Sequence, residues 1–224
     1  MVIIGIDDAG RGPVIGPMVL GGVMIEKITE EKLKELGVKD SKMLYPKQRT
    51  KMKKVIEEIS KGSKAVIMTA KEINDYMDKN INLNTIEAIA AAQVINYLLK
   101  EKEEEVTIIL DCPSVNTKAW LERVKEFMIR KENVKFICEH KADQNYVVVG
   151  AASIIAKVTR DEEIKKLREK IGKDFGSGYP NDPKTKEFLK EHYKEYQEEE
   201  IFRKHWSTIT RLTEEKTGIQ KKLY

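Results

Sequence analysis

The chain has few of the residues that mark secreted or membrane proteins. It contains only 2 cysteines among 224 residues, Cys112 and Cys138, and they form no Cys-x-x-Cys motif of a metal or redox site. No apolar run approaches the roughly 20 residues that a membrane-spanning helix needs, and no secretory leader precedes the first apolar segment. We therefore expect a cytoplasmic protein whose cysteines are packing residues rather than a disulfide.

Histidine is also scarce. The 3 histidines are His140, His192 and His205, and none falls in a serine or cysteine nucleophile arrangement. We interpret all of them as structural residues. The sequence therefore gives no support for a hydrolase that depends on a Ser–His or Cys–His pair.

The chain lacks a large excess of charge of either sign. Lys and Arg number 41 and Asp and Glu number 37, which leaves a formal net charge of +4. Net charge alone therefore does not indicate a nucleic-acid partner. Basic residues do gather over residues 39–54 and near the C-terminus, where they would either attract phosphate or form a solvated surface.

Two acidic residues follow the first apolar run. Residues 2–6 are apolar and β-branched, which predicts a buried strand with Asp7 and Asp8 at its carboxyl end. Neighbouring side chains in a strand point to opposite faces, so both acids would reach one site only if the chain turns at Asp8. Paired carboxylates suit Mg²⁺ or Mn²⁺; the alternative is an acidic turn in solvent.

Hydrophobic periodicity predicts an α/β fold with a mixed sheet covered by helices. Further strands are expected over residues 18–25, 64–69, 106–110 and 134–138, and helices over residues 46–60, 83–102, 147–167, 184–197 and 205–216. A Gly- and Pro-rich loop begins at Gly176 and breaks the regular pattern. We therefore predict one domain of residues 1–176 and a small helical appendage with a basic tail over residues 177–224.

Further acids lie where a ligand site would form. Asp111 ends the strand over residues 106–110, and Asp143 lies just before a helix. If the strands of Asp7 and Asp111 are adjacent and parallel, both of these acids, Asp8 and Asp143 meet at the carboxyl edge of the sheet. Such a cluster suits two-metal phosphoryl chemistry, in which the ions lie ~3.5–4 Å apart.

Several motifs, in this order, carry a resemblance to a known family: residues 5–17 (GIDDAGRGPVIGP), 39–42 (KDSK), Asp111, 140–143 (HKAD), 151–157 (AASIIAK), 176–180 (GSGYP) and 205–206 (HW). The chain resembles ribonuclease H type 2 (ribonuclease HII), most of all its archaeal members, over nearly its whole length. The resemblance implies a ribonuclease-H-like mixed sheet with a small helical C-terminal part. It also implies an endonuclease that hydrolyses the RNA strand of RNA–DNA hybrids and nicks 5′ of ribonucleotides in duplex DNA, leaving 3′-hydroxyl and 5′-phosphate ends.

The resemblance also assigns roles to residues. It implies metal ligation and catalysis by Asp7, Asp8, Asp111 and Asp143 with two Mg²⁺ or Mn²⁺ ions, reading of the ribose 2′-hydroxyl by Gly10, Arg11 and Gly12, phosphate contacts by Ser41 and Lys42, and placement of Tyr179 against the sugar at the RNA–DNA junction. The chemistry agrees, because the 2′-hydroxyl distinguishes RNA from DNA and glycine allows close backbone approach. Without the resemblance, Tyr179 would equally suit a lid over the core, and Ser41 with Lys42 a helix-entry turn.

One position departs from the family pattern, which has Glu where this chain has Asp8. The shorter side chain keeps the carboxylate but changes its reach, and a misplacement of ~1 Å can cost on the order of a hundredfold in rate. We expect weakened activity and a shifted preference towards Mn²⁺.

The C-terminal segment offers one possible partner site. Residues 220–224 (QKKLY) faintly resemble the start of a sliding-clamp-binding peptide, although a basic tail without a partner is the simpler interpretation. Two other functions stay open on sequence alone: a nucleic-acid-binding scaffold with an impaired active site, and an actin-like phosphate-loop ATPase. We expect a monomer.

Overall fold

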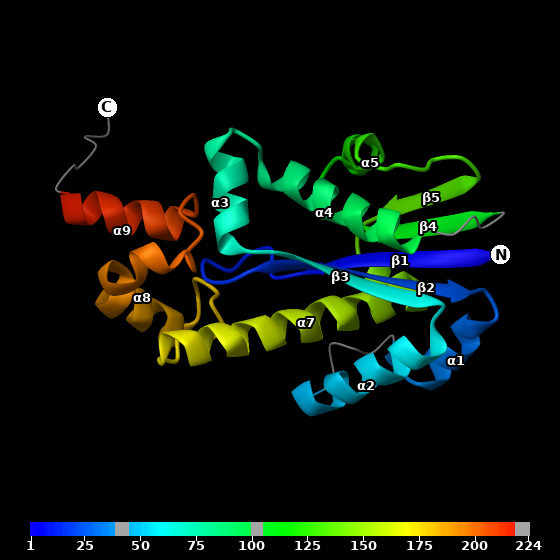
Figure 1. Cartoon of the computed structure of the whole chain (residues 1–224), viewed down its shortest axis with the longest axis horizontal. Helices are drawn as coiled ribbons and strands as arrows, with labels where there is room; N and C mark the ends of the chain where they lie inside the picture. Colours follow the sequence, from blue (N-terminus) through cyan, green and yellow to red (C-terminus); the bar gives the residue numbers. More distant parts are fainter. Residues whose placement is uncertain (39–44, 100–104, 218–224) are drawn as a thin grey trace. The chain divides into compact units, whose positions relative to one another are not determined.

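A computed structural model describes residues 1–38, 45–99 and 105–217 (Figure 1). The chain divides into two compact units that interleave along the sequence. The first unit holds residues 1–9, 19–67 and 82–161, and the second holds residues 10–18, 68–81 and those from 162 onwards. This division differs from a single boundary after residue 176, because short segments from the first half of the chain pack with the C-terminal helices.

The first unit is built on a five-stranded sheet in the order β3-β2-β1-β4-β5. The strands are β1 (Val2–Ala9), β2 (Met18–Glu26), β3 (Gly62–Met68), β4 (Val106–Asp111) and β5 (Val134–Glu139). β1 pairs antiparallel with β2 and parallel with β4, which in turn pairs parallel with β5. The predicted mixed sheet is confirmed, and the strands that carry Asp7 and Asp111 meet the condition of being adjacent and parallel.

Helices cover both faces of this sheet (Figure 1). One face packs against the first part of α7 (Val147–Ile171) together with α1 (Thr29–Glu35) and α2 (Pro46–Ile59). The other face packs against α4 (Leu83–Leu98), which itself contacts α5 (Thr117–Glu126). The short α6 (Ala142–Asn145) follows β5.

Two glycines let α7 lie very close to the sheet. A Cβ atom on Gly5 would lie 2.5 Å from the backbone of Val148, and one on Gly21 would lie 2.5 Å from the carbonyl oxygen of Ala152. The first turns of α7 thus meet strands that have no side chain at the contact. This close packing brings Ser153 of α7 to the carboxyl end of β1.

The second unit contains α3 (Ala70–Asp78), the last part of α7, α8 (Pro183–Tyr196), a short 3-10 helix η2 (Gln197–Glu199) and α9 (Ser207–Thr217). Its core is rich in aromatic rings: Phe188 lies 5.8 Å from Phe175 and 6.3 Å from Phe202 between ring centroids. The segment after β1 joins this core, because Val14 and Ile15 are buried in it and Ile15 forms an isolated antiparallel bridge with Phe202.

Four helices were not predicted from the hydrophobic pattern, namely α1, α3, α5 and α6. Local signals were present for two of them. Thr69 and Glu72 form a reciprocal capping box that begins α3, and the Asn116 side chain accepts a hydrogen bond from the amide of Ala119 at the start of α5. Across the described residues, no helix combines the length and the apolar character needed to cross a membrane.

Candidate active site

The strand β1 does not turn at Asp8. β1 continues through Ala9 because β2 pairs with it to the end, with Asp7 opposite Gly21 and Asp8 opposite Leu20. In a regular strand these two side chains point to opposite faces of the sheet. The Asp8 amide donates a hydrogen bond to Oδ1 of Asp7 at 2.8 Å, and the turn comes at Gly10, whose φ is +85°.

Asp7 is a buried carboxyl group beside other acids. Its side chain is 5% exposed. Burial raises the pKa of Asp7 well above its ordinary value, and the negative charges of Asp8 and Asp111 raise that pKa further, while a hydrogen bond with Ser153 opposes the shift. A carboxylate in this position is favourable only when a positive charge compensates it.

Asp111 lies beside Asp7 at the end of β4 and close to Asp143. Its pKa is raised by burial and by the charge of Asp143, while hydrogen bonds from the amides of Ala142 and Lys141 and from the Asp7 side chain lower it. The amide of Ala142 donates to Oδ1 of Asp111 at 3.0 Å. Lys141 adopts a left-handed backbone conformation with φ +59°, an uncommon one for a non-glycine residue.

The four acids Asp7, Asp8, Asp111 and Asp143 thus lie in the first unit and interact as a chain of neighbours. Their hard oxygen donors suit a divalent cation. Burial raises the pKa of Asp7 and that of Asp111, so their negative charges are unfavourable unless a cation compensates them. As the side chains stand, however, the described residues contain no group of three or more His, Cys, Asp or Glu residues arranged to hold a metal ion.

The second unit brings the Gly10–Gly12 segment together with Tyr179. A Cβ atom on Gly12 would lie 3.4 Å from Cε1 of the Tyr179 ring, so the ring lies against a backbone with no side chain. Tyr179 is 43% exposed. The proximity of these two motifs, which are far apart in the sequence, is what a shared contact with one sugar requires.

The Tyr179 loop is held by close backbone contacts. Gly178 has a φ of +79°, and a Cβ atom there would lie 2.6 Å from the carbonyl oxygen of Ile15. The Gly178 carbonyl accepts a hydrogen bond from the amide of Val14 at 2.8 Å, and its amide donates to the buried hydroxyl of Thr185 at 3.0 Å. The loop is therefore fixed against the segment that follows Gly12.

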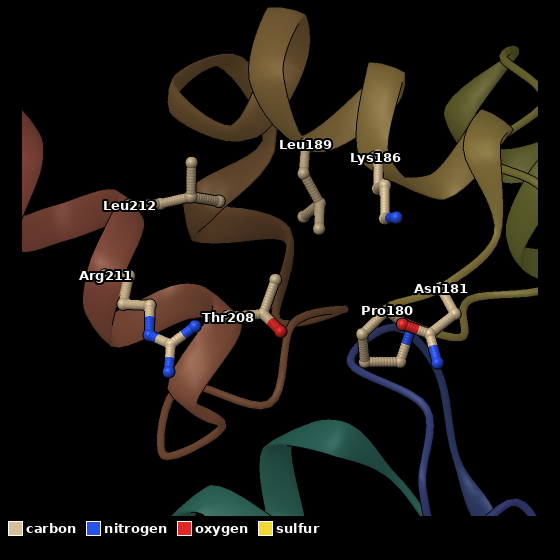
Figure 2. Close-up of a pocket in the computed structure, with 7 residues that line it drawn as sticks. All are labelled: Pro180, Asn181, Lys186, Leu189, Thr208, Arg211 and Leu212. Carbon is tan, nitrogen blue, oxygen red and sulfur yellow. The ribbon is translucent and has the colours of Figure 1, made fainter.

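A groove of about 350 Å³ lies beside the Tyr179 loop, with α8 and α9 along its sides (Figure 2). Its lining residues are Pro180, Asn181, Lys186, Leu189, Thr208, Arg211 and Leu212. Lys186 of α8 and Arg211 of α9 bring positive charge to it, and Pro180 and Asn181 directly follow Tyr179 in the chain. A groove with two cations suits a phosphate-bearing chain.

Comparison with known proteins decides the family. The sequence profile of the Ribonuclease HII family matches residues 4–209. The ribonuclease HII of Methanocaldococcus jannaschii is 47% identical over 221 residues, covering 95% of each chain. The chain belongs to the ribonuclease HII family.

Solved structures of the ribonuclease HII family have the same fold. The crystal structure of the ribonuclease H2 from Pyrococcus horikoshii OT3 matches with a TM-score of 0.85 at 42% identity, covering 98% of this chain and 100% of that one. The ribonuclease HII in the PCNA:RNase HII complex from Archaeoglobus fulgidus matches with a TM-score of 0.80 at 36% identity, covering 92% and 96%. The predicted ribonuclease-H-like fold is confirmed.

Ribonucleases HII are metal-dependent endoribonucleases that cleave RNA in RNA–DNA hybrids, and family membership gives this activity to the chain. The ATPase and scaffold alternatives are not favoured. Ser41, Lys42 and the tail over residues 220–224 lie outside the described residues. Ser153, which hydrogen-bonds with Asp7, and Arg203, whose guanidinium donates to the carbonyl oxygens of Gly10 and Arg11, were not predicted as site residues. Ser153 could have been noticed as a polar residue in the small apolar run that begins α7, whereas Arg203 carried no local signal.

Proposed function

We propose that this ribonuclease HII nicks duplex DNA on the 5′ side of a single embedded ribonucleotide. The contact between Gly12 and the Tyr179 ring supports this proposal most strongly. A bare backbone at Gly12 allows a ribose to approach its backbone groups closely, and the aromatic face beside it suits the neighbouring sugar. Recognition of one ribonucleotide requires such contacts with a single sugar, because every other nucleotide in the duplex is DNA.

The reaction is hydrolysis of a phosphodiester bond. The oxygen of a water molecule forms a bond to phosphorus while the bond from phosphorus to the O3′ of the preceding deoxynucleotide breaks, and that oxygen leaves with a proton as a 3′-hydroxyl. The ribonucleotide keeps the 5′-phosphate. Asp7, Asp8, Asp111 and Asp143 act as the oxygen ligands and proton acceptors of this step, while Gly10, Arg11, Gly12 and Tyr179 select the ribonucleotide.

We assign two Mg²⁺ or Mn²⁺ ions to the acids when substrate is bound. The donor chemistry supports this assignment, since carboxylate oxygens are the ligands that these ions prefer. When bound, the ions supply Lewis-acid stabilisation of the charge that develops on the phosphate. The reach of the Asp8 side chain decides whether all four acids can hold the ions together, because neighbouring side chains in a regular strand such as β1 point to opposite faces.

The groove beside Tyr179 extends the proposed substrate path. Lys186 and Arg211 line it from two helices, and the loop residues after Tyr179 complete it. We assign these two cations to phosphates of the strand that carries the ribonucleotide. Ser41 and Lys42 keep their proposed role as further phosphate contacts.

Cleavage of a labelled DNA duplex containing one ribonucleotide tests the proposal. With Mg²⁺ or Mn²⁺, we expect a single nick 5′ of the ribonucleotide, a product with a 3′-hydroxyl, and no cleavage of an all-DNA duplex of the same sequence. Cleavage by Asp8→Glu alone would mean that Asp8 disables a correctly assigned site. If neither protein cleaves the substrate, the proposed function is wrong.

A sliding clamp is a proposed second partner, through the tail over residues 220–224. The solved complex of a related ribonuclease HII with PCNA supports it. Deletion of residues 217–224 should abolish binding to an archaeal clamp in a pull-down or by calorimetry, while cleavage of a short duplex stays unchanged. Absence of clamp binding by the full chain would remove this partner. Monomeric state and cytoplasmic location stay predictions from the sequence.

A further inference from the structure

Arg203 is a fully buried cation that holds three backbone carbonyl groups of one loop. It is 0% exposed. Its Nε donates to the carbonyl oxygen of Gly16 at 3.0 Å, Nη1 to that of Arg11 at 2.8 Å and Nη2 to that of Gly10 at 2.6 Å. A planar guanidinium presents five N–H donors in a fixed arrangement, which a lysine ammonium cannot reproduce.

Trp206 extends this arrangement to a fourth carbonyl group. Its indole Nε1 donates to the carbonyl oxygen of Gly12 at 3.1 Å, and the Arg203 guanidinium carbon lies 4.9 Å from the centroid of the Trp206 ring. The Arg203 amide also donates to the carbonyl of Val14 at 2.9 Å. We call Arg203 and Trp206 together the carbonyl clamp. All of these residues belong to the second unit.

The carbonyl clamp determines where the amides of the loop point. In a planar trans peptide unit, the C=O of one residue and the N–H of the next point in opposite directions. Fixing the carbonyl of Gly10 therefore fixes the amide of Arg11, and fixing the carbonyl of Arg11 fixes the amide of Gly12. These amides are backbone groups of the segment to which we assign recognition of the 2′-hydroxyl.

We infer that Arg203 and Trp206 are positioning residues that set the selectivity for a ribonucleotide over a deoxyribonucleotide. This inference rests on the proposed function, because it explains how the Gly10–Gly12 segment reads a 2′-hydroxyl. A loop with positive φ at Gly10 and Gly16 has many alternative conformations in isolation. The buried guanidinium selects one of them before substrate arrives, which reduces the ordering cost of recognition.

The test compares affinities rather than rates. Dissociation constants are measured, with Ca²⁺ in place of Mg²⁺, for a duplex with one ribonucleotide and for an all-DNA duplex of the same sequence. The ratio of the two constants reports selectivity, and a partly unfolded sample changes both constants equally. A purely structural role for the carbonyl clamp would therefore leave the ratio unchanged.

We expect Arg203→Lys to reduce this selectivity by roughly tenfold, because an ammonium carries its donors on one nitrogen and cannot reproduce the spacing of Nε, Nη1 and Nη2. Trp206→Phe keeps an aromatic ring but loses the N–H donor, and should reduce it by about threefold. Phe188→Leu is the matched control, since it removes a buried ring from the same core and no hydrogen bond to the loop.

Three outcomes separate the possibilities. Lower selectivity in Arg203→Lys and Trp206→Phe with native selectivity in Phe188→Leu supports the inference. Native selectivity in both Arg203→Lys and Trp206→Phe overturns it. If Arg203→Lys does not fold, the selectivity of Trp206→Phe alone decides. A native protein that binds both duplexes equally would instead overturn the proposed function.

Discussion

Asp7 and Asp111 follow directly after a matched pair of residues on two parallel strands, Ile6 and Leu110, and their carboxyl groups share a hydrogen bond. Each lies in surroundings that raise its pKa, chiefly through burial. Like charges this close oppose the ionisation of both acids. A divalent cation would compensate the two charges.

Removing the charge of Asp7 should stabilise the protein while it inactivates the enzyme. The raised pKa means that the fold favours protonated Asp7, so its contribution to stability is present at low pH and is lost as pH rises. The loss begins near the ordinary carboxyl range, about pH 4, and ends above the raised pKa. In EDTA, urea unfolding should show this fall for the native protein and a smaller fall for Asp7→Asn.

Activity provides the second measurement on Asp7→Asn. Loss of one ligand charge should reduce kcat by at least about a hundredfold. Added Mg²⁺ should raise the unfolding midpoint of the native protein at neutral pH more than that of the variant. An equal effect of Mg²⁺ on both proteins would contradict the assignment of Asp7 as a ligand.

Restoring the longer acid at position 8 should increase the rate. Asp8→Glu adds one methylene group and lets the carboxylate reach further from β1, so we expect kcat with Mg²⁺ to rise by about ten- to a hundredfold. The preference for Mn²⁺ over Mg²⁺ should narrow at the same time. Asp8→Asn, which has the same length without the charge, serves as the control and should be slower than the native protein. Equal kcat values for the native protein and Asp8→Glu would contradict the prediction.

Alanine at two glycines should separate recognition from folding. Gly12 has no positive φ and its added Cβ would make an ordinary contact with Tyr179, so Gly12→Ala should fold normally and raise KM for the single-ribonucleotide duplex by about tenfold. Gly178→Ala would place a Cβ 2.6 Å from a carbonyl oxygen at positive φ, and should lower the free energy of unfolding by about 1–3 kcal/mol. Thermal unfolding and steady-state kinetics distinguish the two, and the reverse pattern would contradict the described loop geometry.

Neutralising the groove should change the salt dependence of binding. Lys186→Ala and Arg211→Ala each remove one cation next to the Tyr179 loop. Each should weaken affinity for duplexes with and without a ribonucleotide alike and reduce the slope of log affinity against log salt concentration by about 1. Lys166→Ala removes a lysine of the same unit that pairs with Glu163, and is the control. An unchanged slope in both groove variants would exclude the groove from the substrate path.

The sequence predicted much of the sheet and the positions of the acids, because buried strands are apolar and their ends are marked by polar residues. It left open whether the chain turns at Asp8, and in the structure the strand continues. β2 supplies pairing partners up to Ala9, and those hydrogen bonds outweigh the local turn signal. It also missed α3. This helix has only 9 residues, and its apolar residues pack within the second unit.

By itself the sequence determined the family, the chemistry of the donors and the flexibility of the glycine segments, since these depend on residue types and their order. Only the tertiary structure decided which groups face one another. Arg203 lies 193 residues after Gly10 in the chain and yet donates to its carbonyl. No periodicity or motif reports such a contact, because it arises when distant segments pack into one core and a buried cation must find acceptors there.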